Sequence, residues 1–192
     1  MNTNSKKIIL ASASPRRKEL LAGLCVDFEV DTRNDFEEVI DPSIPHDKIP
    51  EALSEGKSYG FHRPLEIDEI LITSDTLVLC EGKVMGKPAT REEAYDMLKM
   101  LSGQDHKVIT AVTIRDHERI ITFSDTAIVC FKSLTDSEIY FYIDNFKPFD
   151  KAGAYGIQEW IGYIGIDRIE GSYFTIMGFP VHLVYKHLND FI

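Results

Sequence analysis

Two adjacent arginines stand near the start of this 192-residue chain. Ser14 is a good N-cap and Pro15 suits the first helical position, so Arg16 and Arg17 fall in the first turn of a predicted helix. The free N–H groups there already make the potential positive, and each cation costs about 0.3–1 kcal/mol. Two cations side by side in this unfavourable position indicate a functional site. Together with the hydroxyls of Ser12 and Ser14, the two guanidinium groups could bind a phosphate group. The alternative is that both arginines are simply solvated on an exposed turn.

A second polar group interrupts an apolar stretch. Ile70–Ile72 predicts a buried strand, Thr73–Thr76 is polar, and Leu77–Cys80 is apolar again. This pattern predicts that Asp75 and Thr76 lie at the end of a strand, where open α/β sheets expose their binding clefts.

Two further segments carry groups that could contact a ligand. The acidic region Asp27–Asp47 contains Glu37 and Glu38 and is broken into a loop by prolines. It is either a solvated loop or a source of one or two carboxylates for a metal ion. In Asp150–Gln158, two glycines either let the backbone approach a ligand or simply form turns.

The elements that must position these residues alternate between strands and helices. Capping signals predict helices that begin after Ser14, Thr90 and Thr135. The inward-facing stripes of the last two are predicted to be Ala94, Met97, Leu98 and Leu101, and Ile139, Tyr142, Ile143 and Phe146. Further helices are predicted over Pro50–Tyr59 and from Pro180 onward. Predicted strands cover Ile8–Ala11, Val26–Val30, Lys107–Arg115, Arg119–Phe123, Thr126–Phe131, Tyr163–Ile169 and Ser172–Met177.

Composition excludes several classes of protein. The net charge of −10 counts against nucleic-acid binding, although a small phosphorylated ligand would respond to a local cluster of cations. No apolar run approaches the roughly 18 residues of a membrane span, and Met1–Lys7 lacks the apolar core of a secretory signal. Three widely spaced cysteines predict reduced, buried thiols in a cytoplasmic protein. The six histidines show no metal-ligand spacing, which favours surface or packing roles.

Six stretches in this order resemble the Maf family of nucleoside triphosphate pyrophosphatases, also labelled septum-formation inhibitors. The stretches are Leu10–Leu21, Ser74–Thr76, Gly86–Pro88, Leu101–His106, Asp150–Gln158 and Gly171–Tyr173. Asp150–Gln158 is similar to the subgroup that acts on dTTP and UTP, whereas the 7-methyl-GTP subgroup carries glutamate where this chain has Gln158. Two departures are Thr73-Ser74 in place of the usual Gly-Ala, and Glu55-Gly-Lys-Ser58 in place of an alanine-rich helix.

The resemblance implies an α/β fold, with a mixed twisted sheet flanked by helices and two lobes with a cleft between them. Residues 1–192 would form one Maf-like domain of the ITPase-like type, usually a homodimer. The implied reaction is hydrolysis of pyrimidine nucleoside triphosphates (dTTP and UTP, with CTP or modified forms as further candidates) to the monophosphate and pyrophosphate. The implied cofactor is Mg²⁺ or Mn²⁺, and no nucleic acid or membrane is a partner.

The resemblance also implies roles for individual residues. Asp75 matches the family's general base. Glu38, with Glu37 as the alternative, matches an acidic residue near the metal. The matches to phosphate-binding positions are Ser12, Arg16, Arg17, Lys57 and Lys87, and those to substrate choice are Arg16, Thr76 and Gln158. An aspartate is ordinarily a weak base at neutral pH. Either its surroundings strengthen Asp75, or a metal acidifies the water and Asp75 is a metal ligand.

Two other functions fit the same residues. One is a phosphatase that releases orthophosphate from nucleotides. The other is a non-catalytic nucleotide-sensing module in cell-division control, against which the presence of Asp75 in an intact match counts.

Overall fold

A seven-stranded mixed sheet organises residues 6–192, the part of the chain that the computed structural model describes. Residues 1–5, on which part of the secretory-signal prediction falls, lie outside it. The strand order is β2-β1-β3-β5-β6-β7, with β4 paired to β3. The strands are β1 (Lys7–Leu10), β2 (Phe28–Val30), β3 (Glu69–Cys80), β4 (Lys83–Met85), β5 (Asp105–Arg115), β6 (Ile120–Phe131) and β7 (Ile166–Glu170). Pairs β1–β2 and β1–β3 are parallel, whereas β3–β4 and β6–β7 are antiparallel.

Helices flank this sheet, so the predicted α/β class with a mixed sheet is confirmed. They are α1 (Pro15–Ala22), α2 (Ile49–Tyr59), α3 (Arg91–Leu101), α4 (Asp136–Phe146), α5 (Trp160–Gly165), α6 (Tyr173–Ile176) and α7 (Val181–Leu188), with 3₁₀ turns η1 (His46–Lys48) and η2 (Ala152–Ala154). Within the described residues, each of these helices is too short or too polar to traverse a lipid bilayer.

The chain forms two compact units. Unit 1 comprises the residues up to Asp75, Thr110–Asp125 and Gly178–Ile192. Unit 2 comprises Thr76–Ile109 and Thr126–Met177. Strands β3, β5 and β6 therefore contribute residues to both units.

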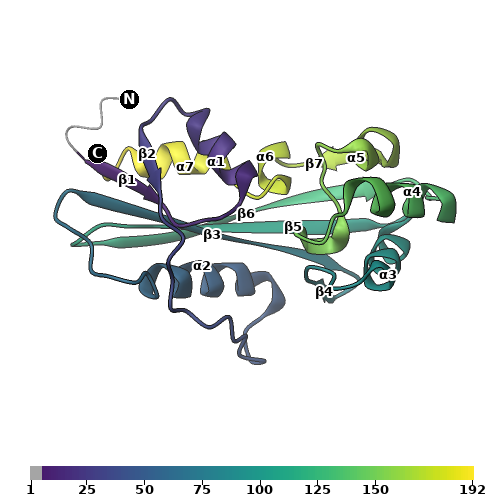
Figure 1. Ribbon diagram of the computed structural model, residues 1–192, viewed down its shortest axis with the longest axis horizontal. Coiled ribbons are helices and arrows are strands. Elements are labelled where there is room, and N and C mark those ends of the chain that lie inside the picture. The colour runs from purple at the N-terminus through teal and green to yellow at the C-terminus, as the bar shows by residue number, and fades with distance from the viewer. Residues whose placement is uncertain (1–5) are drawn as a thin grey trace. The chain divides into compact units, whose positions relative to one another are not determined.

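In unit 1, the strands bury side chains on both faces. Ile8 and Ile70 belong to one apolar cluster with Leu21 of α1 and Val184 of α7, whereas Leu71 belongs to another cluster. Figure 1 shows α1 and α7 on one face of the sheet and α2 on the other. Because successive side chains of a strand point to opposite faces, Thr73 and Asp75 share the α2 face with Leu71, and Ser74 points to the other face.

In unit 2, α3 and α4 pack against each other with the predicted inward faces. Ala94, Leu98, Leu101, Ile139, Tyr142 and Ile143 are buried, and Met97 packs partly buried against the same core, which confirms these positions. Phe146 is 37% exposed, so the predicted stripe of α4 is wrong at its last residue. Thr135 makes the complete capping box that the sequence predicts. Thr90 caps α3 by accepting from the N–H of Glu93, but the Glu93 carboxylate accepts from Ala89 N rather than from the Thr90 backbone.

The predicted interruption at Thr73–Thr76 is wrong, because β3 runs unbroken from Glu69 to Cys80. Asp75 and Thr76 therefore lie within a strand rather than at its end. Thr73 and Ser74 are both buried, and their hydroxyls donate to backbone carbonyls of other elements. Polar side chains that find partners in this way do not break a strand.

Three other local predictions are corrected. The two strands expected over Arg119–Phe123 and Thr126–Phe131 are one strand, β6, in which Ser124 donates to Glu51 Oε1 at 2.5 Å. Ser172–Met177 contains the helical turn α6 rather than a strand, and Tyr163–Ile169 divides between α5 and β7. Short apolar runs of this kind fit either structure by periodicity alone.

The predictions for Cys80, Cys130 and His106 are confirmed, and the one for Cys25 is wrong. Cys80 and Cys130 are buried free thiols as predicted, but Cys25 is exposed because it follows α1 in a turn with φ of +56°. His106 is a packing residue: it is buried, and desolvation lowers its pKa to about 4, so that it is neutral at pH 7. Its Nε2 atom lies 2.8 Å from the Tyr155 hydroxyl.

Candidate active site

A lysine bridges two carboxylates in unit 1. Lys57 Nζ lies 2.6 Å from Asp75 Oδ1 and 2.8 Å from Glu38 Oε1. Lys57 lies on α2, Asp75 on β3, and Glu38 in the acidic loop between β2 and η1. The Lys57 and Asp75 side chains are only 21% and 15% exposed, so their attraction is screened less than that of a surface pair. Of the two alternatives, the structure pairs Glu38 rather than Glu37 with Lys57.

Two glycines of unit 1 let the acidic loop reach α2. A Cβ atom on Gly56 would lie 2.4 Å from the ring of Phe36, and one on Gly60 would lie 2.5 Å from Phe36 Cβ. Asn34 ties the same loop to α2 by donating to the Lys57 carbonyl at 2.6 Å. The glycine that weakens α2 by about 1 kcal/mol relative to alanine therefore lets Phe36, and with it Glu38, pack against the helix.

Arg17 is built into the fold of unit 1. Its Nε donates to the Gly178 carbonyl at 3.0 Å, and its Nη1 donates to the Ser74 carbonyl at 2.8 Å and to Ser12 Oγ at 3.3 Å. Ser12 Oγ also accepts from the N–H of Ser14, whose own hydroxyl accepts from Arg17 N at the start of α1. This confirms the predicted N-cap and adds a structural role for Arg17 that the sequence pattern did not indicate.

Charges of both signs act on Arg17. Burial lowers the pKa of its guanidinium to about 10, the carboxylates of Asp75 and Glu38 oppose that shift, and the neighbouring Arg16 adds to it. Arg17 thus stays charged at neutral pH. Arg17 and Lys57 therefore both interact electrostatically with Asp75 and Glu38 within unit 1.

The remaining predicted residues belong to unit 2. Thr76 follows Asp75 in β3, Lys87 is exposed in the segment between β4 and α3, and Gln158 is half-buried after η2. The Oε1 atom of Gln158 is buried and has no hydrogen-bond partner within residues 6–192. An unpaired buried acceptor of this kind is costly unless a ligand supplies the donor.

A buried ionic network holds the segment around Gln158. Lys151 Nζ lies 3.1 Å from Glu159 Oε1 and 2.7 Å from Asp150 Oδ1, and its side chain is 9% exposed. The Tyr142 hydroxyl donates to Glu159 Oε2 and accepts from the N–H of Gly156 at 2.9 Å. The sequence assigned Tyr142 only to a core stripe, because nothing in its spacing signals the hydroxyl's partners.

The two glycines of this segment make room for neighbouring side chains of unit 2. Gly153 has a φ of +68°, and a Cβ atom there would lie 3.1 Å from Val78. A Cβ atom on Gly156 would lie 2.9 Å from Glu159 Cδ and 3.1 Å from Lys151 Cε. Both glycines are therefore required by neighbouring side chains within unit 2.

The donor set of unit 1 fits a hard divalent cation that also binds a substrate. Mg²⁺ is usually held by one or two carboxylates plus phosphate oxygens rather than by an all-protein cage. Glu38 and Asp75, both within 2.8 Å of Lys57 Nζ, supply two such carboxylates. No cluster of three or more His, Cys, Asp or Glu side chains suited to a metal occurs within residues 6–192.

Comparison with known proteins finds one family over nearly the whole chain. The family model described as Maf-like protein matches residues 7–191. The chain belongs to the Maf family. The matched range contains all of the predicted site residues, from Ser12 to Gln158.

Relatives of this Maf-family chain cover it almost completely. A dTTP/UTP pyrophosphatase from Parabacteroides distasonis is 48% identical over 190 residues, which are 99% of this chain and 98% of that protein. Another from Porphyromonas gingivalis is 45% identical, covering 99% of this chain and 96% of that protein. Among solved structures, a HAM1 protein from Coxiella burnetii covers 96% of this chain and 99% of its own, with 13% identity and a TM-score of 0.48.

The contacts of Arg17 in this Maf-family chain predict unequal effects of the two arginines on stability. Arg17→Ala is expected to lower the free energy of unfolding by about 1–3 kcal/mol, because the Ser74 and Gly178 carbonyls lose their donor. Arg16→Ala removes a cation from the first turn of α1 and is expected to change stability by less than about 1 kcal/mol. Urea unfolding of the nucleotide-free proteins measures both, and equal losses would contradict the structural role of Arg17.

Proposed function

We propose that this protein hydrolyses dTTP and UTP between the α and β phosphates, releasing the monophosphate and pyrophosphate. Family membership and the names of its relatives support this class of substrate. The observation that carries the proposal is the contact of 2.6 Å between Lys57 and Asp75, flanked by Glu38. A carboxylate beside cations is the arrangement that water attack on a phosphate ester requires.

Asp75 orients the attacking water and accepts its proton. Lys57 fixes the Asp75 carboxylate through Oδ1, and the second oxygen, Oδ2, takes the proton as the water oxygen bonds to the α phosphorus. The bond between the α phosphorus and the bridging oxygen breaks, and pyrophosphate leaves. Arg16, Arg17, Lys57 and Lys87 neutralise the triphosphate and the charge that develops on the leaving group, and Ser12 positions Arg17.

Glu38 is the residue that would hold a divalent ion while Asp75 acts as the base. In the alternative scheme Asp75 would be a second ligand, and the ion rather than Asp75 would activate the water. Mg²⁺ or Mn²⁺, when bound there, supplies positive charge to the phosphate oxygens and acidifies a water molecule. The Lys57 ammonium, which contacts both carboxylates, offsets their mutual repulsion before the ion and the nucleotide arrive.

Gln158 reads the base, together with Arg16 and Thr76. Uracil and thymine present a donor at N3 and an acceptor at O4, and one amide can pair with both. The buried Oε1 atom of Gln158 accepts from N3–H in this scheme, which gives it the donor that residues 6–192 do not provide. The network of Lys151, Glu159 and Tyr142 keeps the segment that carries the amide in place.

Asp75→Asn tests the catalytic assignment. The substitution removes a charge at nearly constant shape, so turnover is expected to fall by about 10²–10⁴-fold while the protein stays folded and binds nucleotide. The measurement is pyrophosphate release from UTP with Mg²⁺. Asp68→Asn is the matched control, since Asp68 precedes the same strand and pairs at the surface with Lys7.

Three outcomes would contradict the proposal. Wild-type turnover in Asp75→Asn would remove Asp75 from the mechanism. Release of orthophosphate alone by the unmodified protein would make it a phosphatase. Nucleotide binding without any turnover would make it a sensor.

Gln158→Glu tests base choice. Glutamate offers only acceptors and suits the paired donors on guanine N1 and N2. We expect a decrease in kcat/KM for UTP that corresponds to about 1–3 kcal/mol of lost transition-state stabilisation, the cost of a mispaired buried polar group. Activity on GTP should fall much less or rise. The measurement is kcat/KM on UTP, CTP and GTP, with the exposed Gln104→Glu as control. An equal decrease for all three substrates would mean that Gln158 supports the loop and does not read the base.

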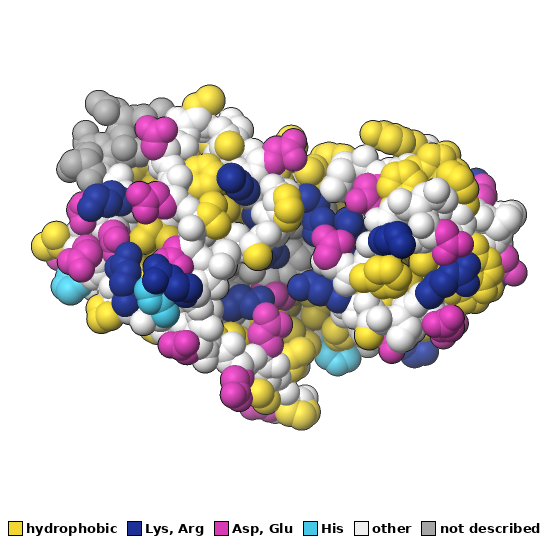
Figure 2. Space-filling model, viewed as in Figure 1, with side chains coloured by type: hydrophobic (Ala, Val, Ile, Leu, Met, Phe, Trp, Pro, Cys, Tyr) yellow, Lys and Arg dark blue, Asp and Glu magenta, His cyan; other side chains and the backbone are white. Residues whose placement is uncertain are grey.

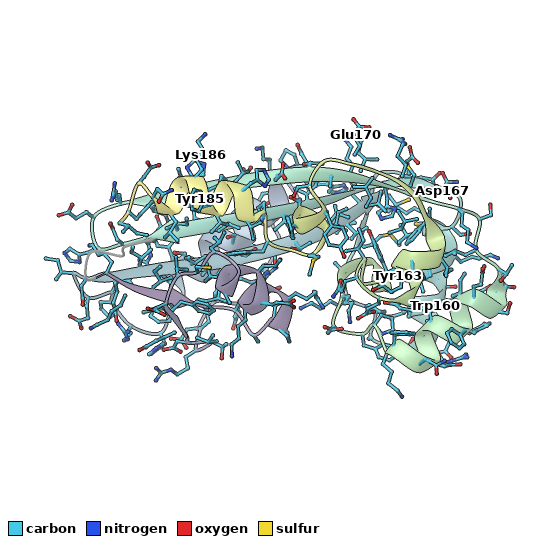
Figure 3. All side chains as sticks on the ribbon, turned by 90° about the horizontal axis from the view of Figure 1, so that it is seen from above. Trp160, Tyr163, Asp167, Glu170, Tyr185 and Lys186 are labelled. Atoms are coloured by element: carbon cyan, nitrogen blue, oxygen red, sulfur yellow. The ribbon has the colours of Figure 1, made fainter. Side chains whose placement is uncertain are left out.

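Homodimer formation, which the resemblance implies, is proposed as well. Hydrophobic side chains gather over α4 and α5 of unit 2 (Figure 2). Tyr163 is 80% exposed and lies on α5 with Trp160 (Figure 3). The Trp160 ring packs at a tilt against the 48% exposed Phe141 of α4, with 4.7 Å between the ring centroids. Exposed apolar patches often mark protein interfaces. Sedimentation velocity at micromolar concentration is expected to give the mass of two chains, and a monomer would contradict the proposal.

A further inference from the structure

Two buried serines on one face of α2 differ in their hydrogen bonding. Ser54 and Ser58 are both fully buried and lie one helical turn apart. The Ser54 hydroxyl has hydrogen-bond partners, whereas Ser58 Oγ has none within residues 6–192. The same side chain thus occurs twice on one helix face, once bonded and once not.

Ser54 and Thr73 bond each other reciprocally. Thr73 Oγ1 donates to the Ser54 carbonyl at 2.7 Å, and Ser54 Oγ donates to the Thr73 carbonyl at 3.2 Å. These bonds join α2 directly to β3. Because both residues are fully buried, a polar group freed by breaking either bond could not bond to water instead.

The bonded hydroxyls continue across the sheet. Ser54 Oγ lies 3.0 Å from Thr113 Oγ1 of β5, which lies 3.0 Å from Thr122 Oγ1 of β6. Thr122 Oγ1 also lies 3.4 Å from Glu55 Oε2 of α2. Ser54, Thr113 and Thr122 carry three hydroxyl protons for these four contacts, so three of the four are hydrogen bonds at any one time. We call Ser54, Thr73, Thr113 and Thr122 the hydroxyl array. It connects α2 to three neighbouring strands, all through residues of unit 1.

The array adjoins the Lys57–Asp75 contact from both sides. Ser54 precedes Lys57 by three residues of the helix, and Thr73 precedes Asp75 by two residues on the same face of β3. A slip of α2 by one residue would move Lys57 by about 1.5 Å along the helix axis and rotate it by about 100°, away from Asp75. The array opposes such a slip, because its hydrogen bonds require specific atoms to face each other.

We propose that Ser54 and Thr73 are positioning residues for the reaction, with Thr113 and Thr122 supporting them. They hold α2 in the register at which Lys57 Nζ contacts Asp75 Oδ1. The inference rests on the proposed function, since it concerns the use of Lys57 and Asp75 in turnover. Ser54 and Thr73 therefore affect kcat as well as stability, because the Lys57 ammonium must stay beside the reacting Asp75 carboxylate.

The first test compares Ser54→Ala with Ser58→Ala. Ser58→Ala removes a buried hydroxyl that has no partner, so kcat and Tm should stay unchanged or Tm should rise. Ser54→Ala should lower kcat at least tenfold, with KM for UTP changed less than threefold. Thr73→Val should behave like Ser54→Ala, and Thr73→Ser should recover most of the lost kcat because it keeps the hydroxyl. Equal kcat for the two serine variants would overturn the inference.

A double-mutant cycle separates positioning from general loss of stability. Ser54→Ala should lower kcat far less in a Lys57→Ala background than in the unmodified protein, because the group it positions is already gone. The same factor in both backgrounds would overturn the inference. If turnover in the Lys57→Ala background is too slow to measure, the crystal structure of Ser54→Ala decides. A Nζ–Oδ1 distance beyond 3.5 Å supports the proposal, and an unchanged 2.6 Å overturns it.

Failure of the proposed function gives a different result. If the unmodified protein releases no pyrophosphate from UTP with Mg²⁺, the proposed reaction is wrong, and the crystal structure still tests the array. If the unmodified protein turns over and Ser54→Ala matches Ser58→Ala, only the positioning role is wrong.

Discussion

The contact between Lys57 and Asp75 is the interaction on which the candidate site depends. Neither side chain is more than about a fifth exposed, so each has given up much of its hydration. Breaking a largely buried ion pair by removing one partner typically costs about 3–5 kcal/mol, yet forming it adds little net stability. Such a pair makes sense as part of a reaction centre. Its geometry must then come from the elements that carry it, a helix on one side and a strand on the other.

Those elements were largely predictable, whereas their mutual fit was not. Ser14 and Pro15 mark the start of α1, and the apolar stripes of α3 and α4 point to the core as their periodicity predicts. The polar quartet in β3 misled the prediction, because the partners of Thr73 and Ser74 lie 19 and 104 residues away. A sequence pattern registers the polarity of a side chain but not the distant group that satisfies it.

For the site residues too, the identities could be predicted but the contacts between them could not. The family resemblance named Lys57, Asp75 and Glu38 separately, but no spacing rule shows that they touch, and none distinguishes Glu38 from Glu37. That choice depends on how the acidic loop packs against α2, which Phe36 and the Asn34 side chain decide. Around Gln158, Tyr142 has a regular place in a helix stripe, so its bonds to Glu159 and Gly156 had no signal in the sequence. Local patterns thus identified chemical groups, and tertiary packing set their partners.

The close approach of Phe36 to Gly56 also constrains how this chain can change over evolutionary time. At 2.4 Å, no side chain larger than hydrogen fits at position 56 while the aromatic ring keeps its place. A lineage that acquires alanine there, and so gains a more stable α2, must first or simultaneously accept a smaller or displaced residue at position 36. The two positions should therefore vary together among descendants of this sequence, and the order of the two substitutions should be constrained.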